Sequence, residues 1–155
     1  MVKKINLASE PAGKEILSTP CVPVTPTTIQ SFISLMEDLK DTANAHPGCV
    51  GLSANQIWES PDVAAPMICV VPGTAGWAYI INPSIKKSWK KETIMPEGCM
   101  SIPNFAIQKQ KRIKHVVVSY YNEKMELQDD VHLFEFPARI FQHEVDHLRG
   151  KLLND

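Results

Sequence analysis

The residues most able to do chemistry form one short segment, His143-Glu144-Val145-Asp146-His147. On an α-helix, residues four positions apart share one face, with their Cβ atoms about 5–6 Å apart. Two imidazoles at that spacing can bind one divalent metal ion. Glu144, beside the first histidine, can accept a proton from a water molecule that the metal activates. The segment therefore predicts a metal-dependent hydrolase, with His143 and His147 as ligands and Glu144 as general acid/base.

The alternative is a surface helix whose histidines bind nothing. Apolar residues share the segment with the histidines, however: Ile140, Phe141, Val145 and Leu148. We therefore expect the helix to be buried. Buried polar side chains need partners, and a metal ion supplies them, so the pattern favours a metal site.

A hydrolytic site of this kind usually has three protein ligands and one open position. Leu153 stands where the HExxHxxGxxH pattern requires its third histidine, so we expect the third ligand upstream of the helix. The candidates are the four cysteines, three other histidines and distant carboxylates. Cys99 lies between Gly98 and Pro103, where a turn can direct its thiol into a cleft. Spacing alone hardly separates Cys99 from Cys49.

The elements that must position these residues follow from the hydrophobic pattern. Four prolines between residues 11 and 26 predict an extended, irregular arm. Thr27 or Thr28 can then cap an amphipathic helix that runs to Ala43 and ends before Pro47-Gly48. A late helix is expected at residues 138–148, with Pro137 in its first turn and Gly150 at its C-terminal end.

Apolar runs between turn residues predict antiparallel strands in the remainder of the chain. The expected strands are residues 67–71, 78–81 closed by Asn82-Pro83, 84–91 as a lysine-rich edge strand, 112–121, and 125–136 after a turn at 122–124. The predicted fold class is α+β, with mostly antiparallel sheets packed around a central HExxH helix and an N-terminal amphipathic helix. Residues 1–155 are expected to form a single domain.

Composition limits the function further. The chain has 155 residues, of which 44% are hydrophobic and 21% charged, and its net charge is −1. A chain of this length can form one core, and without a basic excess it is not expected to bind nucleic acid directly. No apolar run approaches the roughly 20 residues that span a bilayer, and no apolar region follows Lys3-Lys4 as in a secretory signal. The four cysteines, with no CxxC pair, are expected to be free thiols.

Three segments, in order along the chain, together resemble the signature of a known family. They are Gly51-Leu52-Ser53-Ala54-Asn55-Gln56, Glu97-Gly98-Cys99-Met100-Ser101 and Gln142-His143-Glu144-Val145-Asp146-His147. In the peptide deformylase family the matching segments read GLAAxQ, EGCLS and QHExDH. One match is weak by itself, whereas three in the same order are specific. The resemblance covers nearly the whole chain.

The resemblance implies that the chain removes the formyl group from the N-formylmethionine of newly made polypeptides and releases formate. It implies one divalent metal ion, with Fe²⁺ as the native ion and Zn²⁺, Ni²⁺ or Co²⁺ able to occupy the site. Cys99, His143 and His147 would be the ligands, and Glu144 would be the general acid/base.

The resemblance also implies how the substrate is held. Gln56 and the backbone N–H of Met100 would stabilise the oxyanion of the tetrahedral intermediate. Backbone groups would pair with the substrate as an added β-strand. The residues expected to provide them are Val50, Gly51, Leu52 and Gly98.

Five positions depart from the family pattern. Cys49 stands where the family usually has glycine, Ser53 where it has alanine, and Met100 where it has leucine. Ala106 and Lys111 stand where arginines near the far end of the substrate are expected. Substrate preference beyond methionine is therefore not predicted.

Two other functions fit the same ligands, namely a different metal-dependent amidase or protease, and a metal- or peptide-binding protein without activity. The presence of Gln56, Cys99 and Glu144 argues against the inactive protein. A narrow apolar pocket for methionine would favour the deformylase. Four residues are expected to line it: Val50, Met95, Phe136 and Ile140.

The expected partners are N-formylmethionyl nascent peptides, which the enzyme can meet at the ribosome. We expect a monomer that does not associate with membranes. The expected location is the cytoplasm of a bacterium, or the host cytoplasm if the sequence is viral. An organellar location is less favoured.

Overall fold

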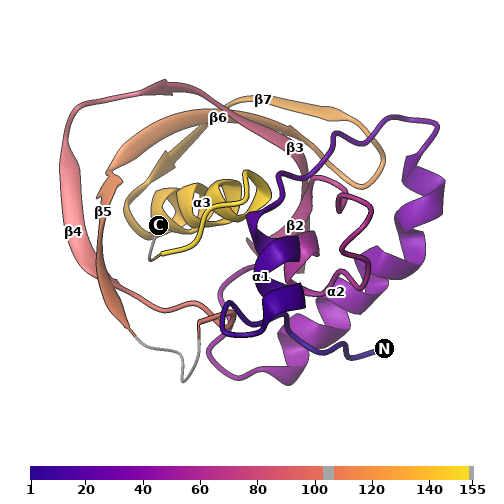
Figure 1. Cartoon of the computed structure of the whole chain (residues 1–155). Helices are drawn as coiled ribbons and strands as arrows, with labels where there is room; N and C mark the ends of the chain where they lie inside the picture. The colour runs from indigo at the N-terminus through magenta and orange to yellow at the C-terminus, as the bar shows by residue number, and fades with distance from the viewer. Residues whose placement is uncertain (103–106, 154–155) are drawn as a thin grey trace.

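Alternating and apolar runs between turn residues form the strands of two antiparallel sheets. The computed structural model describes residues 1–102 and 107–153 (Figure 1). The larger sheet has the order β1-β2-β3-β6-β7, with β1 at Leu52–Ser53, β2 at Ile68–Gly73, β3 at Gly76–Ser88, β6 at His115–Tyr121 and β7 at Leu127–Phe134. The smaller sheet pairs β4 at Glu92–Glu97 with β5 at Gln108–Ile113. Antiparallel sheets combined with helices confirm the predicted α+β class.

The helices within the described residues lie near the two ends of the chain. They are α1 at Pro11–Ser18, α2 at Ile33–Ala45, α3 at Glu135–Leu148, and the short 3₁₀-helices η1 at Ile29–Phe32 and η2 at Ala54–Gln56. None of them is long and apolar enough to cross a membrane.

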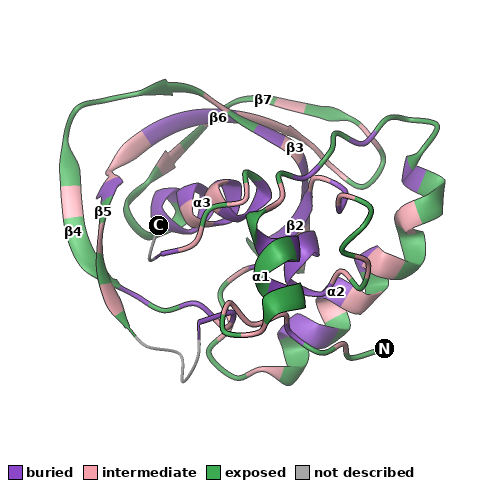
Figure 2. Ribbon diagram, viewed as in Figure 1, coloured by how far each residue is buried: buried purple, intermediate pink, exposed green. Residues whose placement is uncertain are grey.

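Helix α3 lies in the middle of the molecule, under the arch of β6 and β7 and beside β4 and β5 (Figure 1). It contacts β1, β2, β5, β6, β7 and η2, and most of its residues are buried (Figure 2). Gly150 ends it with a φ of +79°, a conformation that glycine adopts readily. A Cβ atom at position 150 would also lie only 2.5 Å from the carbonyl oxygen of Ser18, which is too close for any residue other than glycine.

The main core joins α2, α3 and the larger sheet. Its fully buried members include Leu39, Ile68, Ile81, Val118 and Leu148. Each such side chain contributes about 1.5–3 kcal/mol when it is removed from water. The core thus fixes α3 against the sheet, and with it the residues that α3 carries.

The N-terminal prediction is wrong in two respects. The expected irregular arm contains α1, because Pro11 occupies the first turn, where its missing N–H is no loss. The expected amphipathic helix starts with η1, and neither helix has a side-chain cap. Thr28 Oγ1 instead accepts a hydrogen bond from the backbone N–H of Thr25 at 2.8 Å.

Several strand boundaries also differ from the prediction. The expected strand at 125–136 ends at Phe134, because α3 begins at Glu135. Asn82-Pro83 does not close a strand, since β3 continues through a register shift at this point, where Asn82 has a φ of 51°. The expected edge strand at 84–91 is the second half of β3, and residues 84–88 pair with β6. The expected strand at 112–121 breaks at Lys114 into β5 and β6, which belong to different sheets.

Candidate metal centre and active site

Three side chains that can bind a metal ion converge between α3 and the segment after β4. Cys99 follows the end of β4, and His143 and His147 lie one turn apart on α3. Their ligand atoms all lie within 4.8 Å of one another. Cys99 Sγ is 3.2 Å from His147 Nε2, which is 3.2 Å from His143 Nε2. Within residues 1–102 and 107–153 this is the only such group of three or more.

The structure therefore separates the two cysteines that sequence spacing could not. Cys99 is 5% exposed and joins the histidine pair. The Cys49 thiol donates instead to the carbonyl oxygen of Gly51 at 3.3 Å. The possible metal site thus consists of one thiol and two imidazoles.

The distances and charges of the cluster fit a divalent ion. Ligand atoms around a tetrahedral Zn²⁺ lie about 3.3–3.6 Å apart, given metal–ligand bonds of about 2.0–2.3 Å. Burial opposes a charge on His143, but contacts with Cys99 and Glu97 outweigh burial and raise its pKa to about 10. The surroundings therefore favour a positive charge here, which a bound cation supplies in place of the proton. Burial holds the pKa of His147 well below its usual range, which keeps this imidazole in the neutral form that binds metals.

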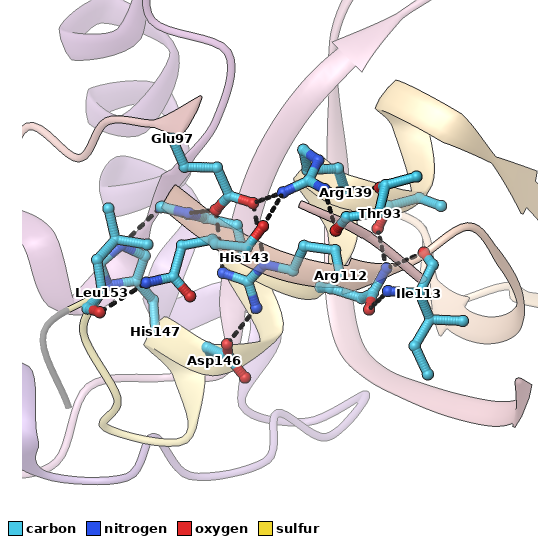
Figure 3. Close-up of polar contacts among 12 residues, drawn as sticks. Thr93, Glu97, Arg112, Ile113, Arg139, His143, Asp146, His147 and Leu153 are labelled. Atoms are coloured by element: carbon cyan, nitrogen blue, oxygen red, sulfur yellow. Dashed lines mark hydrogen bonds and ion pairs between the residues drawn. The ribbon is translucent and has the colours of Figure 1, made fainter. Parts of the chain in front are cut away.

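Glu97 orients His143 through a hydrogen bond to the ring nitrogen that faces away from Cys99 and His147. The Nδ1–H of His143 donates to Glu97 Oε1 at 2.9 Å (Figure 3). This bond leaves the other ring nitrogen, Nε2, on the side of Cys99 and His147. Burial by itself would raise the pKa of Glu97, but hydrogen bonds from His143 and Arg112 outweigh it and lower the pKa to about 2. Glu97 is therefore a buried carboxylate that stays ionised.

Two arginines neutralise Glu97 and tie the smaller sheet to α3. Arg112 on β5 donates from Nε and Nη2 to the two carboxylate oxygens, at 3.0 Å each, and also pairs with Asp146. Arg139 on α3 donates to Glu97 and, at 2.9 Å, to the carbonyl oxygen of Thr93 (Figure 3). These contacts hold β4, and therefore the segment that carries Cys99, against the metal-binding helix.

Glu97 and Arg112 were not predicted from the sequence to support the site. Arg139 could have indicated a buried acidic partner. It lies on a helix that is expected to be buried, and a buried charge requires an opposite charge nearby. Lys111 is exposed, and its neighbour Arg112 is the buried cation. Ala106, the other departure from the family pattern, lies outside the described residues.

We predict that Glu97→Gln lowers metal affinity about 10- to 100-fold, the usual effect of removing a hydrogen-bond partner of a metal-binding histidine. The melting temperature should also fall, since two buried arginines lose a charge partner. Competition for Zn²⁺ with a chromophoric chelator measures the affinity. Glu92→Gln, an exposed carboxylate on the same strand, is the matched control. Equal affinity in both variants would show that Glu97 does not support the site.

Glu144 lies beside the ligands with a free carboxylate oxygen. It is 3% exposed, and its Oε2 has no hydrogen-bond partner among the described residues. Burial raises its pKa to about 7, although His143 and Arg112 act in the opposite direction. A carboxyl group with a pKa near neutrality is suited to both accepting and returning a proton.

A cavity of about 510 Å³ opens onto this group and is mostly apolar. Its lining includes the four residues expected to form a methionine pocket: Val50, Met95, Phe136 and Ile140. Four chemically important side chains also line it: Gln56, Cys99, His143 and Glu144. The four residues therefore line one apolar cavity, which also reaches Cys99 and His143.

The remaining expected site residues lie around the same cavity, with one exception. Gly51, Gly98 and Met100 line it. Leu52 does not, because its side chain is fully buried in the core, and its backbone belongs to β1 at the edge of the larger sheet. The Nε2 of Gln56 donates to Ser101 Oγ at 3.1 Å and lies 3.8 Å from Cys99 Sγ.

Gly51 leaves room for the carboxylate of Glu144. A Cβ at this position would lie 2.5 Å from Glu144 Oε1. We predict that Gly51→Ala displaces Glu144 and lowers kcat about 100-fold, because a shift of about 1 Å in a reacting group costs this much. Gly73→Ala is the control for kcat, because it adds the same Cβ outside the cavity lining, where the nearest atom is Ala78 Cβ at 3.0 Å. A crystal structure of Gly51→Ala with Glu144 unmoved, together with undiminished turnover, would contradict the prediction.

A buried carboxylate beside a thiol and two imidazoles, at the base of an apolar cavity, is typical of a metal-dependent hydrolase. Comparison with known proteins agrees. The family model for polypeptide deformylase matches residues 3–155. A peptide deformylase of Symbiobacterium thermophilum is 35% identical over 97% of this chain and 65% of its own length. A peptide deformylase of Pseudothermotoga lettingae is 34% identical over 100% of this chain and 82% of its own length.

Solved structures give the same result. The peptide deformylase of Thermotoga maritima has a TM-score of 0.84 and 28% identity, covering 100% of this chain and 97% of its own. A class I type b peptide deformylase of Acinetobacter baumannii with Met-Ala-Ser bound has a TM-score of 0.83 and 25% identity, covering 99% and 97%. The chain belongs to the polypeptide deformylase family, whose members are hydrolases that remove the N-formyl group from newly made polypeptides.

Proposed function

We propose that this chain hydrolyses the formyl group of N-formylmethionyl peptides with the help of one metal ion held by Cys99, His143 and His147. The observation that carries the proposal is the convergence of these three ligand atoms within 4.8 Å beside the buried carboxylate of Glu144. We propose residues 1–155 as a single catalytic domain in which α3, the HExxH helix, is the central element and α2 is the N-terminal amphipathic helix.

Fe²⁺ is the proposed native ion, and Zn²⁺, Ni²⁺ or Co²⁺ can take its place. A thiol with two imidazoles supports this choice, because soft and borderline ligands suit iron and zinc better than magnesium. When bound, such an ion lowers the pKa of a water molecule and polarises a carbonyl oxygen.

Glu144 is proposed to move the protons. Its unpartnered Oε2 accepts a proton from the attacking water, and the carboxyl group then returns that proton to the leaving amine as formate is released. The pKa of about 7 supports both steps, since the group gains and loses a proton near neutral pH. Gly51 supports the arrangement by leaving space for this carboxylate.

Gln56 and Met100 are proposed to stabilise the oxyanion that forms when water attacks the formyl carbon. Gln56 is 2% exposed, and its Nε2 lies on the side of Cys99. Met100 lines the cavity next to Cys99, where its backbone N–H can provide the second donor. Donors that are fixed before the reaction contribute most to this kind of stabilisation.

The peptide is proposed to bind as an added β-strand. Among residues 1–102 and 107–153, strand β1 pairs only with β2 and forms the edge of the larger sheet, so the backbone near Val50, Gly51 and Leu52 can accept another strand. Gly98 also lines the cavity. The methionine side chain would enter the apolar part of the cavity.

Formylated nascent polypeptides are the substrates of this family, and we propose that the chain acts on them as a monomer in the bacterial cytoplasm, in contact with ribosomes. The relatives named above are bacterial proteins, which supports this location.

The proposal is tested by incubating the Fe²⁺-loaded protein, without oxygen, with formyl-Met-Ala-Ser and with acetyl-Met-Ala-Ser. We expect formate from the first peptide and little or no acetate from the second, because the site that holds a formyl group must exclude an extra methyl group. Equal cleavage of both peptides would indicate a broader amidase. No formate with one metal bound per chain would reject the deformylase function.

A further inference from the structure

A capping box holds the side chain of Gln56. Ser53 precedes the 3₁₀-helix η2, and its hydroxyl accepts a hydrogen bond from the backbone N–H of Gln56. In return, the Gln56 side chain accepts a hydrogen bond through Oε1 from the backbone N–H of Ser53 at 3.0 Å. Such reciprocal bonds usually satisfy the first turn of a helix. Here the third residue of the box is also the glutamine proposed to contact the oxyanion.

The capping box decides which end of the Gln56 amide faces the metal ligands. A backbone N–H can only donate, so the Gln56 atom that faces Ser53 must be the oxygen. The nitrogen is then on the other side, where Nε2 lies 3.1 Å from Ser101 Oγ and 3.8 Å from Cys99 Sγ. The single proton of the Ser53 hydroxyl lies between two acceptors, Asn55 Oδ1 at 2.8 Å and Gln56 Oε1 at 3.1 Å, and its share toward Oε1 favours the same orientation.

The same hydroxyl is linked to the metal-binding helix. Ser53 Oγ donates to Asn55 Oδ1 at 2.8 Å, and Asn55 Nδ2 donates to the backbone carbonyl oxygen of His147 at 2.7 Å. Ser53 and Asn55 are 0% exposed, so no water competes for these bonds. A change at Ser53 therefore reaches Gln56 on one side and α3 on the other.

We propose that Ser53 is a positioning residue for deformylation and acts by holding Gln56 Nε2 toward the oxyanion. This inference rests on the proposed function. Ser53 is one of the positions at which the chain departs from the GLAAxQ pattern, in which alanine stands. Alanine keeps the backbone N–H that binds Gln56 Oε1, but it cannot supply the hydroxyl. The chain thus has a restraint on Gln56 that the alanine pattern lacks.

Ser53→Ala is expected to lower kcat about fivefold, the factor that corresponds to one typical capping hydrogen bond. KM should stay within about twofold, because the restraint serves an interaction made in the transition state. Ser84→Ala is the control, since it also removes a hydrogen-bonded serine hydroxyl, one that lies 2.9 Å from Ser119 Oγ on a strand outside the cavity. Ser53→Gly removes the same hydroxyl and replaces Ser53→Ala if the alanine variant does not fold.

A double-mutant cycle separates positioning from a merely structural effect. In a Gln56→Ala background, Ser53→Ala should leave kcat unchanged within about twofold, because the side chain that it positions is gone. An equal loss of kcat in both backgrounds, or no loss in either, would overturn the proposal.

The side-chain amide resonances of Gln56 in ¹⁵N-labelled protein give a readout that does not depend on activity. They should shift and broaden in Ser53→Ala and stay in place in Ser84→Ala. If the wild-type protein releases no formate, the proposed function fails, and these resonances still test the restraint. Resonances of Gln56 that do not move in Ser53→Ala would overturn the positioning role.

Discussion

Glu144→Gln should abolish most of the turnover while leaving the metal bound. Glutamine has nearly the same shape as glutamate, but it can neither accept a proton from water nor return one to the leaving amine. General acid/base catalysis contributes about 10²–10⁴-fold, and Glu144 is proposed for both proton transfers, so we expect kcat to fall about 10³–10⁴-fold. Formate release at saturating formyl-Met peptide, with metal content measured on the same sample, gives both quantities.

The matched control is Glu135→Gln, which changes an exposed carboxylate on the same helix. It should keep wild-type turnover. A Glu144→Gln protein with one metal per chain and wild-type kcat would remove Glu144 from the mechanism. A variant that has lost its metal would instead make Glu144 a ligand, contrary to the arrangement proposed here.

Cys99→Ser should have the largest effect on metal binding. Loss of a hydrogen-bond partner behind a ligand costs about 10–100-fold in affinity, so loss of the thiol ligand itself should cost more than about 100-fold. Cys49→Ser should bind metal as the wild type does, although Cys49 also lines the cavity. Zn²⁺ competition measures the affinities of the three proteins.

Co²⁺ substitution adds a spectroscopic test of the same prediction. A thiolate bound to Co²⁺ gives a near-ultraviolet charge-transfer band, which we expect in the wild type and in Cys49→Ser but not in Cys99→Ser. A band that disappears in Cys49→Ser instead would exchange the roles of the two cysteines.

The sequence predicts well what depends on local geometry. The spacing of His143 and His147 places both imidazoles on one face of a helix, and α3 brings their Nε2 atoms to 3.2 Å. The apolar residues of that helix indicate burial, which α3 has. Gly150 ends the helix because its φ of +79° suits glycine, and this could also be predicted.

The sequence fails where a result depends on residues far apart in the chain. Cys99 and Cys49 could not be separated by spacing, because the choice depends on which segment β4 and β5 bring to α3. The group around Glu97 joins β4, β5 and α3, and nothing in its local sequence shows that these elements meet. The run from 112 to 121 contains no glycine or proline that would mark a strand end, so the break at Lys114 could not be placed from the local sequence.

The N-terminal error has a different cause. Four prolines predict an irregular arm, yet Pro11 occupies a first turn, where proline is accepted. Ile16 and Leu17 then become buried, and this tertiary packing stabilises an eight-residue helix that would not be stable by itself.

The most direct test of the central claim is a titration of metal-free protein with Fe²⁺ under anaerobic conditions, with formate release from formyl-Met-Ala-Ser measured at each step. We predict that turnover rises linearly and levels off at one equivalent of metal per chain, because Cys99, His143 and His147 form one site. Turnover in the metal-free protein, or a plateau only at two equivalents, would contradict a hydrolase that works with a single metal ion at this site.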